Sequence, residues 1–428
     1  MHSKNKKVER RKTVFYLRTD LYAQDLKAGG SVAHTLGVLE SFCGFGLRVL
    51  CASAAMLDMI QTVDCDEFYI LKQPKIFAKL GFRLNCLISN FFFIPRCLFF
   101  LRKKKIDFVY QRYGLLNFVG ALVAWCKRAP LVLEFNGSEA WIDKHWQDPG
   151  RFRISFAIRW IENFNLRYAK HIIVVSGALK DFLVEAGVDE KKILVNPNGV
   201  DTKKFDPIVL SDDREKMRRA LGLQDKFVFG FIGSFSVWHG IETIAAMIPE
   251  VVRRHPHVHF LLIGSGPLLQ YLKDELKNAG IEKRFVTLTG TVVQSDAPNY
   301  LAACDAFLSP TLANKDGSRF FGSPTKMFEY MSLAKPIIAS DLEQLSELLE
   351  PAVKLDDLKN KSKMFTREVG ILVPPHDIKG FIEAACFLAQ TDEKQKKILG
   401  DNVRQKTEKK YTWHVHTKKI LSFIQKPH

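Results

Sequence analysis

The chain has 428 residues, of which 47% are hydrophobic and 25% charged, a composition typical of folded globular proteins that excludes extensive disorder. This length exceeds what one compact core usually holds, so two domains of about 200 residues each are expected. The net charge of +17 lies mostly in the first half: residues 1–205 hold 32 Lys and Arg against 19 Asp and Glu, a net +13, and the remainder holds 31 against 27, a net +4.

A basic half of this kind suits nucleic acid, an anionic membrane surface or an anionic substrate. The sequence has no zinc-finger spacing, aromatic RNA-binding signature or recognition helix, which excludes nucleic acid as a partner. The segment from Cys86 to Lys105 sets five phenylalanines beside four consecutive cations, but its apolar runs are far shorter than the ~20 residues that a spanning helix needs. Two interpretations stay open: a segment lying on an anionic membrane surface, or a core helix followed by a solvated basic turn.

The eight cysteines form no closely spaced pairs, which argues against both a metal site and a disulfide framework. The charged N-terminal residues are followed only by a short apolar stretch, Val14 to Leu17, which predicts no secretory signal. We therefore expect a cytoplasmic protein, peripheral on the inner face of the membrane if the Cys86–Lys105 segment binds lipid.

The first half alternates strands with helices. Residues 13–17 predict a strand, Gly29 and Gly30 form a loop that opens a helix, and residues 46–52 predict the next strand. The alternation returns over residues 107–137 with two more strands around a helix. Strand, glycine loop and helix in this order form the phosphate-approach geometry of Rossmann-like domains.

Polar residues follow the buried strand predicted over residues 130–135. Asn136, Gly137, Ser138 and Glu139 come at its carboxyl end, where open parallel sheets bind their ligands. Asn136 and Gly137 also form a common turn pair, and that interpretation stays open.

The second half repeats the pattern after a polar stretch, residues 211–219, that suits a surface helix or linker. Residues 227–232 predict a strand that runs into Gly233, a helix opens near Gly240, and residues 259–264 predict the following strand. Alternation in both halves predicts two doubly wound parallel sheets that face each other across a cleft.

The most informative stretch runs from Asp316 to Ser340. A loop ending at Pro324 enters a predicted helix that carries Lys326 in its first turn. Free backbone N–H groups, the positive end of the helix dipole and the lysine charge together form an anion site. Glu329 lies one turn deeper on the same side, where it can accept hydrogen bonds from sugar hydroxyls. The motif alone also fits an ordinary helix start with a solvated Lys and Glu.

This segment, SPTKMFEYM followed by KPIIAS, resembles the donor-binding segment of glycosyltransferase family 4. The resemblance extends over nearly the whole chain and is strongest from about His171 to Leu388. It implies an α/β protein of the GT-B type, with two facing Rossmann-like domains, each with a doubly wound parallel sheet. The acceptor-side domain is expected at residues 1–205 and the nucleotide-sugar domain at residues 206–405. A C-terminal helix within residues 406–428 is expected to pack back on the first domain.

The resemblance also implies site roles. Lys326 and His239 would counter the charge of the donor diphosphate, and Glu329 would hold its ribose; these three are the predicted catalytic residues. The acceptor side is predicted at Asn136, Gly137 and Glu139. The predicted donor-binding residues are Gly29, Gly30, Ser31, Gly233, Ser234, Gly240, Gly264, Gly266, Thr291, Val292, Gly322, Ser323, Pro324 and Thr325.

The chain departs from the family pattern at several positions. The first of the two family glutamates falls on Phe321, and the usual arginine and lysine of the glycine loop are Ser234 and His239. A histidine common near Asn136 is absent. In a subgroup with Ser-Pro-x-Lys before the retained glutamate, the lysine replaces the lost polar contacts.

The family activity implies a retaining hexosyltransferase that moves a sugar from a nucleotide-diphosphate sugar to an acceptor hydroxyl. The acceptor would be a saccharide or a lipid-linked saccharide in surface polysaccharide or glycolipid assembly. No cofactor or metal is expected, since no carboxylate pair has metal-ligand spacing. Two other classes stay open: a sugar-nucleotide epimerase of the same fold, and a non-catalytic membrane-associated nucleotide-sugar binder, which the replacements at Phe321, Ser234 and Asn136 would suit. The coordinated Lys326 and His239 and the retained Glu329 favour an enzyme.

Overall fold

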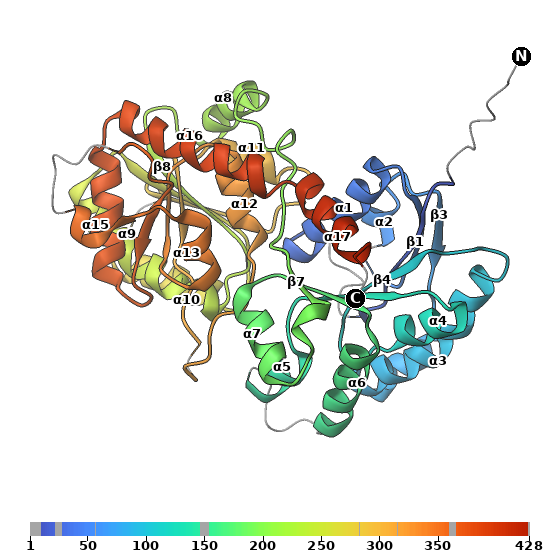
Figure 1. The fold of residues 1–428 in the computed structure, drawn as a ribbon. Helices are drawn as coiled ribbons and strands as arrows, with labels where there is room; N and C mark the ends of the chain where they lie inside the picture. The colour runs from blue at the N-terminus through green and yellow to red at the C-terminus, as the bar shows by residue number, and fades with distance from the viewer. Residues whose placement is uncertain are drawn as a thin grey trace, which may run out of the picture.

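The computed structural model describes residues 10–21, 28–55, 57–145, 154–281, 283–314, 316–358 and 365–426. These residues form two α/β domains, each built on a seven-stranded sheet whose neighbouring strands run parallel. Figure 1 shows the two domains side by side. The two parallel sheets predicted from the alternation of strands and helices are therefore confirmed.

The first sheet has the strand order β3-β2-β1-β4-β5-β6-β7. Its strands are β1 (Thr13–Arg18), β2 (Arg48–Ser53), β3 (Glu67–Ile70), β4 (Phe108–Arg112), β5 (Leu131–Phe135), β6 (His171–Val174) and β7 (Ile193–Val195). Its helices are α1 (Gly30–Gly44), α2 (Leu57–Ile60), α3 (Phe82–Phe100), α4 (Val119–Lys127), α5 (Glu139–His145), α6 (Ser155–Tyr168) and α7 (Gly177–Glu185).

The second sheet has the order β10-β9-β8-β11-β12-β14-β13. Its strands are β8 (Phe227–Ile232), β9 (Val258–Ile263), β10 (Val286–Gly290), β11 (Ala306–Ser309), β12 (Ile337–Ser340), β13 (Val353–Lys354) and β14 (Ile371–Val373). The helices that follow β7 are α8 (Ser211–Leu221), α9 (Ile241–Arg254), α10 (Leu269–Asn278), α11 (Ala297–Ala302), α12 (Thr325–Ser332), α13 (Glu343–Leu349), α14 (Leu355–Leu358), α15 (Ile378–Gln390), α16 (Glu393–Lys410) and α17 (Trp413–Ile424).

The central strand β1 explains why these sheets form. All six of its residues are buried, and successive side chains enter different cores: Phe15 and Leu17 join one hydrophobic cluster, Val14 and Tyr16 another. Helices cover both faces of a parallel sheet, so side chains on both sides of a central strand are buried. The sequence of such a strand is therefore a continuous apolar run.

Helix α3 contains most of the phenylalanine-rich segment and continues through Pro95. One side of the helix packs into the first domain through Phe93 and Cys97, and the other leaves Phe91 and Phe99 exposed. The interpretation of this segment as a core helix explains the buried side of α3 but not its exposed side. Within the described residues, no helix combines the length and the apolar character that crossing a bilayer requires.

The last two helices connect the domains. Helix α16 runs across residue 405 without a break, and α17 lies against α1 of the first domain (Figure 1). Ser41 donates a hydrogen bond to the carbonyl of Trp413 (3.0 Å), and Asn196 donates one to the carbonyl of His416 (3.1 Å). The domain boundaries at 205 and 405 stay predictions.

The contact between α1 and α17 should tolerate no side chain at Gly37. A Cβ at this position would lie 2.2 Å from Cε2 of Trp413, so Gly37→Ala should lower the free energy of unfolding in urea by about 1–3 kcal/mol through overpacking. Gly44→Ala, at the end of the same helix, is the matched control, because nothing lies within 4 Å of its added Cβ. Equal stability of the two variants would contradict this packing.

Candidate active site

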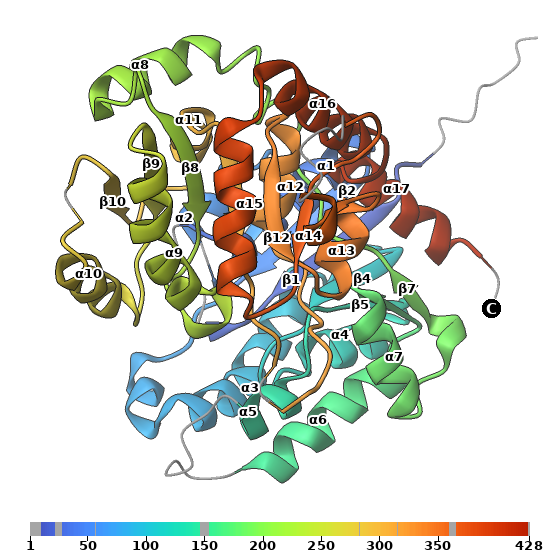
Figure 2. The same cartoon turned by 90° about the vertical axis from the view of Figure 1, so that its left-hand side faces the viewer.

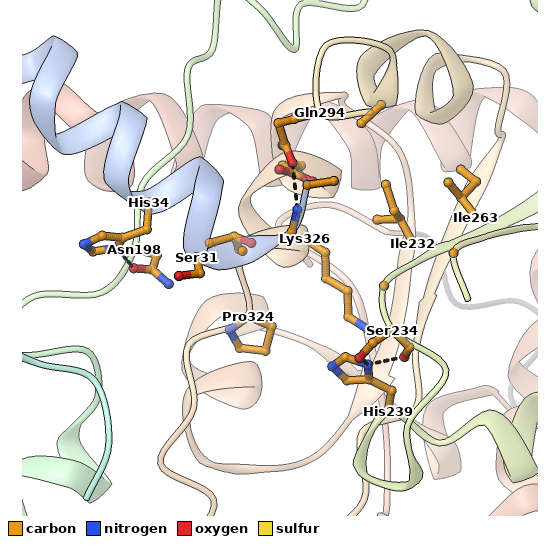
Figure 3. A pocket seen from close by; sticks show the side chains of 18 of the residues that line it. Ser31, His34, Asn198, Ile232, Ser234, His239, Ile263, Gln294, Pro324 and Lys326 are labelled. Carbon is orange, nitrogen blue, oxygen red and sulfur yellow. Dashed lines mark hydrogen bonds between the residues drawn. The ribbon is translucent and has the colours of Figure 1, made fainter. Parts of the chain in front are cut away.

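A cavity of about 500 Å³ lies between the two domains (Figure 3). The loops that follow β1, β4, β5 and β6 line it from the first domain, and those that follow β8, β9 and β10 line it from the second. Both sheets therefore turn their carboxyl ends to the same space, which is where open parallel sheets bind ligands.

Most of the predicted site residues come together in this cavity. Those that line it are Gly29, Gly30, Ser31 and Asn136 from the first domain, and Gly233, Ser234, His239, Gly264, Thr291, Val292, Ser323, Pro324, Thr325, Lys326 and Glu329 from the second. The cavity thus joins segments that lie about 300 residues apart in the chain.

Five predicted residues lie outside the cavity lining: Gly137, Glu139, Gly240, Gly266 and Gly322. Gly240 has a φ of 70° at the start of α9, and a Cβ there would lie 1.8 Å from the carbonyl oxygen of Pro310, so its conformation and its packing both require glycine. Glu139 begins α5, where burial and the neighbouring Glu162 raise its pKa to about 7.

Two helix N-termini meet at the cavity. Helix α1 begins at Gly30 and α12 at Thr325, and a Cβ on Gly30 would lie only 2.7 Å from Oγ1 of Thr325. The backbone N–H of Gly29 donates a hydrogen bond to Oε1 of Gln294 (3.0 Å), drawn in Figure 3. The positive ends of both helix dipoles therefore face the same volume, which favours an anion there.

Lys326 extends from the first turn of α12 into the cavity (Figure 3). Its Nζ is buried, has no hydrogen-bond partner among the described residues, and lies 4.1 Å from the ring centroid of Phe231. Burial lowers the pKa of Lys326 to about 7, although the carboxylate of Glu329 acts in the opposite direction. Burial also raises the pKa of Glu329 to about 7, opposed by Lys204 and Lys326. A buried polar group without a partner is rare in native proteins and points to a missing ligand.

His239 and Ser234 face Lys326 from the loop after β8. Nδ1 of His239 lies 2.6 Å from the carbonyl oxygen of Ser234 and 3.2 Å from its Oγ. Burial and the charge of Lys326 lower the pKa of His239 to about 3. The ring is therefore neutral at pH 7 in this structure, with Nδ1 donating to the carbonyl. That His239 counters the charge of a donor diphosphate stays a prediction.

Sequence reasoning missed a buried network on the first-domain side of the cavity. His34 presents Nε2 to Oε1 of Glu134 (2.8 Å) and Nδ1 to Oδ1 of Asn198 (2.6 Å). Asn198 donates in turn to the carbonyl of Ser323 (2.5 Å), and Arg112 binds Oε1 of Glu134 (2.6 Å). The network links α1, the segment after β7 and the loop before α12.

The carboxylate of Glu134 lies at the centre of this network, and its neighbours stabilise its negative charge. Burial opposes ionisation of Glu134, but His34 and Arg112 outweigh it and hold the pKa of this carboxyl below its usual range. Asn136 donates from Nδ2 to Glu134, and its Oδ1 is buried without a hydrogen-bond partner among the described residues. One sequence signal existed for His34, which lies four residues after Gly30 and so on the same helix face.

Within the described part of the chain, no three His, Cys, Asp or Glu side chains are grouped so that they could hold a metal ion. The cavity instead offers helix N-termini, one lysine, one buried glutamate and polar amide groups.

Comparison with known proteins assigns this site to a family. Residues 28–204 match the family model described as Glycosyltransferase Family 4, and residues 226–391 match the model described as Glycosyl transferases group 1. The chain therefore belongs to glycosyltransferase family 4, as the donor-segment motif predicted, and is a glycosyltransferase with the GT-B fold.

Two curated relatives and one solved structure illustrate the similarity. The chain is 26% identical over 310 residues, 72% of each protein, to the UDP-Gal:alpha-D-GlcNAc-diphosphoundecaprenol alpha-1,3-galactosyltransferase of Escherichia coli. It is 25% identical over 295 residues, 67% of this chain and 71% of the relative, to the N,N'-diacetylbacillosaminyl-diphospho-undecaprenol alpha-1,3-N-acetylgalactosaminyltransferase of Campylobacter jejuni. The Anabaena Alr3699/HepE structure in complex with UDP and glucose aligns with a TM-score of 0.68 at 18% identity, covering 97% of this chain and 99% of that one.

The buried lysine should cost stability in the ligand-free enzyme. Lys326→Met should raise the free energy of unfolding by about 1–4 kcal/mol, the scale for replacing buried charges with apolar groups. Because the pKa of Lys326 falls to about 7 on folding, the unfolded chain binds more protons between pH 7 and about 10.5, and the wild type gains stability over that range. The advantage of Lys326→Met should therefore be largest below pH 7 and shrink as the pH rises.

Urea denaturation at pH 6, 8 and 9.5 measures this trend. Lys394→Met, at an exposed position of α16, is the control and should show no such pH dependence. An advantage of Lys326→Met that stays constant over this range would contradict the burial of an ionisable ammonium.

Proposed function

We propose that this enzyme transfers a sugar, with retention of anomeric configuration, from a nucleotide-diphosphate sugar to a hydroxyl of a lipid-linked saccharide. The observation that carries the proposal is the ammonium of Lys326, which has no hydrogen-bond partner among the described residues and lies where the N-termini of α1 and α12 converge. A diphosphate is a ligand of matching charge and size for that place. The names of two relatives include a diphosphoundecaprenol-linked acceptor, and one of them also names UDP-Gal as the donor.

The other cavity residues suit the remaining parts of such a donor. Glu329, one turn behind Lys326, can accept hydrogen bonds from the ribose hydroxyls. The backbone around Thr291 and Val292 faces the cavity beside Gly264 and can bind the base. The unpaired Oδ1 of Asn136 lies across the cavity, where it can accept a hydrogen bond from a hydroxyl of the transferred sugar.

The chemistry follows from the charge in the cavity. The bond between the sugar C1 and the phosphate oxygen breaks, a bond from C1 to the acceptor oxygen forms on the same face, and the acceptor proton passes to the leaving phosphate oxygen. Negative charge grows on the leaving diphosphate, so Lys326 and the helix N-termini stabilise the transition state more than the bound substrate. His239, 2.6 Å from a carbonyl through Nδ1, can donate to a phosphate through Nε2 once the bound anion has raised the pKa of the ring and Nε2 has taken up a proton from solvent. This chemistry requires no metal ion or cofactor.

The first test measures donor binding. Calorimetric titration with UDP-, GDP-, ADP- and TDP-sugars should find one nucleotide series that binds, and Glu329→Ala should abolish that binding. Glu275→Ala, exposed on α10, is the matched control and should bind as the wild type does. If a folded protein bound no member of the panel, the nucleotide-sugar proposal would fail.

The second test concerns the leaving group. Lys326→Ala should lower the turnover of the donor identified in the panel by about 10²-fold or more, the scale for removing one oxyanion donor. Radiolabelled transfer to a lipid-linked acceptor measures this rate. Release of an epimerised sugar nucleotide without any transfer would instead identify an epimerase.

A lipid-linked acceptor requires that the enzyme reach a membrane, and the first domain offers a matching surface. Between Glu67 and Glu134 the only acidic residue is Asp107, against twelve Lys and Arg. Helix α6 adds an exposed aromatic row, with Phe156 83% and Trp160 60% exposed. Figure 1 and Figure 2 show α3 and α6 on the side of the first domain that faces away from the second sheet. Exposed aromatics interspersed with cations suit an anionic lipid surface on the inner face of the membrane.

Vesicle binding tests this surface. The protein should cosediment with phosphatidylglycerol vesicles but not with phosphatidylcholine vesicles, and about 0.5 M salt should release it. Exchanging both Phe156 and Trp160 for Ser should weaken binding roughly tenfold, on the scale of lost aromatic burial. Tyr271→Ser, at an exposed aromatic of the second domain, is the control. Equal binding to both kinds of vesicle would contradict the charge argument.

A further inference from the structure

The loop that leads from β11 into α12 sends two adjacent phenylalanines into different domains. Phe320 packs against the hydrophobic cluster of the second domain that contains Phe328 and Tyr330. Phe321 packs against the cluster of the first domain that contains Phe135. Successive side chains of an extended chain point to opposite sides, so one short loop contacts both cores.

Phe321 is held by the first domain through its ring and through its backbone. The ring meets Trp141 of α5 edge to face, with centroids 5.1 Å apart and planes at 87°. A Cβ on Gly137 would lie 3.2 Å from Cε2 of the same ring, so the ring also touches the segment after β5. The carbonyl oxygen of Phe321 accepts a hydrogen bond from Oγ of Ser176, at the start of α7 (2.8 Å).

The neighbouring loop residues add polar contacts to the first domain. Asp316 lies 3.1 Å from Nε2 of His145, and Arg319 lies 2.6 Å from Asp181. Both partners of the Arg319 pair are about half exposed, so this pair contributes little on its own. The apolar part of the contact is the half-buried ring of Phe321, which packs against Trp141 and Gly137.

We propose that Phe321 is a positioning residue that holds the two domains together and thereby places the donor loop, Ser323 to Lys326. We call this contact of Phe321 with Trp141, Gly137 and Ser176 the clasp. The inference rests on the proposed function, because it assigns this loop to the donor. The ring of Phe321 is absent from the cavity lining, although the family usually carries a donor-binding glutamate at this position. In this chain the position serves domain contact, and Lys326 and Asn136 are among the polar groups that line the cavity.

Phe321→Ala tests the clasp without any ligand. Small-angle X-ray scattering should show a larger radius of gyration, and hydrogen exchange should become faster at residues 137–141 and 316–323. With the donor identified by calorimetry, KM for the donor should rise about tenfold, a change of about 1.4 kcal/mol, with a smaller change in kcat. A purely structural defect would lower the amount of active enzyme and leave KM unchanged.

Phe320→Ala is the matched control, because it removes the same ring from the same loop on the side of the second domain. It should lower thermal stability but leave the radius of gyration and the exchange at residues 137–141 as in the wild type. Phe321→Leu, which keeps an apolar side chain, should restore most of the donor KM. Phe321→Glu, which introduces the usual family residue, should weaken donor binding as Phe321→Ala does.

If Phe321→Ala does not fold, Ser176→Ala removes the hydroxyl that binds the Phe321 carbonyl and also caps α7, and should speed exchange at residues 316–323 as well as at the start of α7. A wild-type radius of gyration together with wild-type exchange at residues 137–141 in Phe321→Ala would overturn the clasp. Increased donor affinity in Phe321→Glu would overturn it as well. Scattering and exchange need no nucleotide, so failure of the donor panel would leave this test intact.

Discussion

A lysine ammonium buried without a partner is the constraint on which this enzyme's site depends. Lys326 lines the cavity at which the N-termini of two helices meet, and its Nζ lies 4.1 Å from the ring centroid of the buried Phe231. No carboxylate forms an ion pair with it among the described residues, and burial lowers its pKa to about 7. Among the described residues, the charge of Lys326 is thus opposed only from a distance, by the carboxylate of Glu329. In the proposed mechanism a bound diphosphate is stabilised by this charge, and it is stabilised further as it gains charge in the transition state.

The cavity depends on contacts between three segments that are remote in sequence: α1, the segment after β7 and the loop before α12. Asn198, in the segment that joins the domains, contacts His34 of α1 and the carbonyl of Ser323. Trp413 of α17 packs edge to face on His34 with ring centroids 5.3 Å apart, so the C-terminal helix supports the network from behind. The position of α12 relative to α1 therefore depends on contacts made by both the connecting segment and the C-terminal helix.

The departures from the family pattern form a coherent set in this structure. Ser234 holds the ring of His239 through its backbone carbonyl, so that the imidazole faces the cavity beside Lys326. Asn136 is fixed by Glu134, whose charge is matched by Arg112. Phe321 is not among the residues that line the cavity, and it packs, half-buried, against the hydrophobic cluster of the first domain. The replaced side chains each have partners, which is the pattern of an altered site and not of one that has lost its constraints.

Local sequence patterns predicted many of the strands and helices. The apolar runs at residues 13–17 and 227–232 form β1 and β8, and the Gly-Gly loop opens α1 at the predicted residue. The helix that begins after Pro324 was also predictable and is α12. These features depend on neighbours within a few residues, where periodicity and capping act directly.

The sequence by itself thus determined two parallel sheets and the family, and it predicts an anion site made of Ser323 to Glu329. Only the tertiary structure decided that His34 pairs with Asn198, that Gln294 meets Gly29, and that Phe320 and Phe321 enter different cores. The physical reason is the distance in sequence over which each interaction acts. Helix starts and strands follow from local backbone and side-chain preferences. The contacts between remote segments depend instead on how the two sheets pack against each other, and no spacing within one segment encodes that packing.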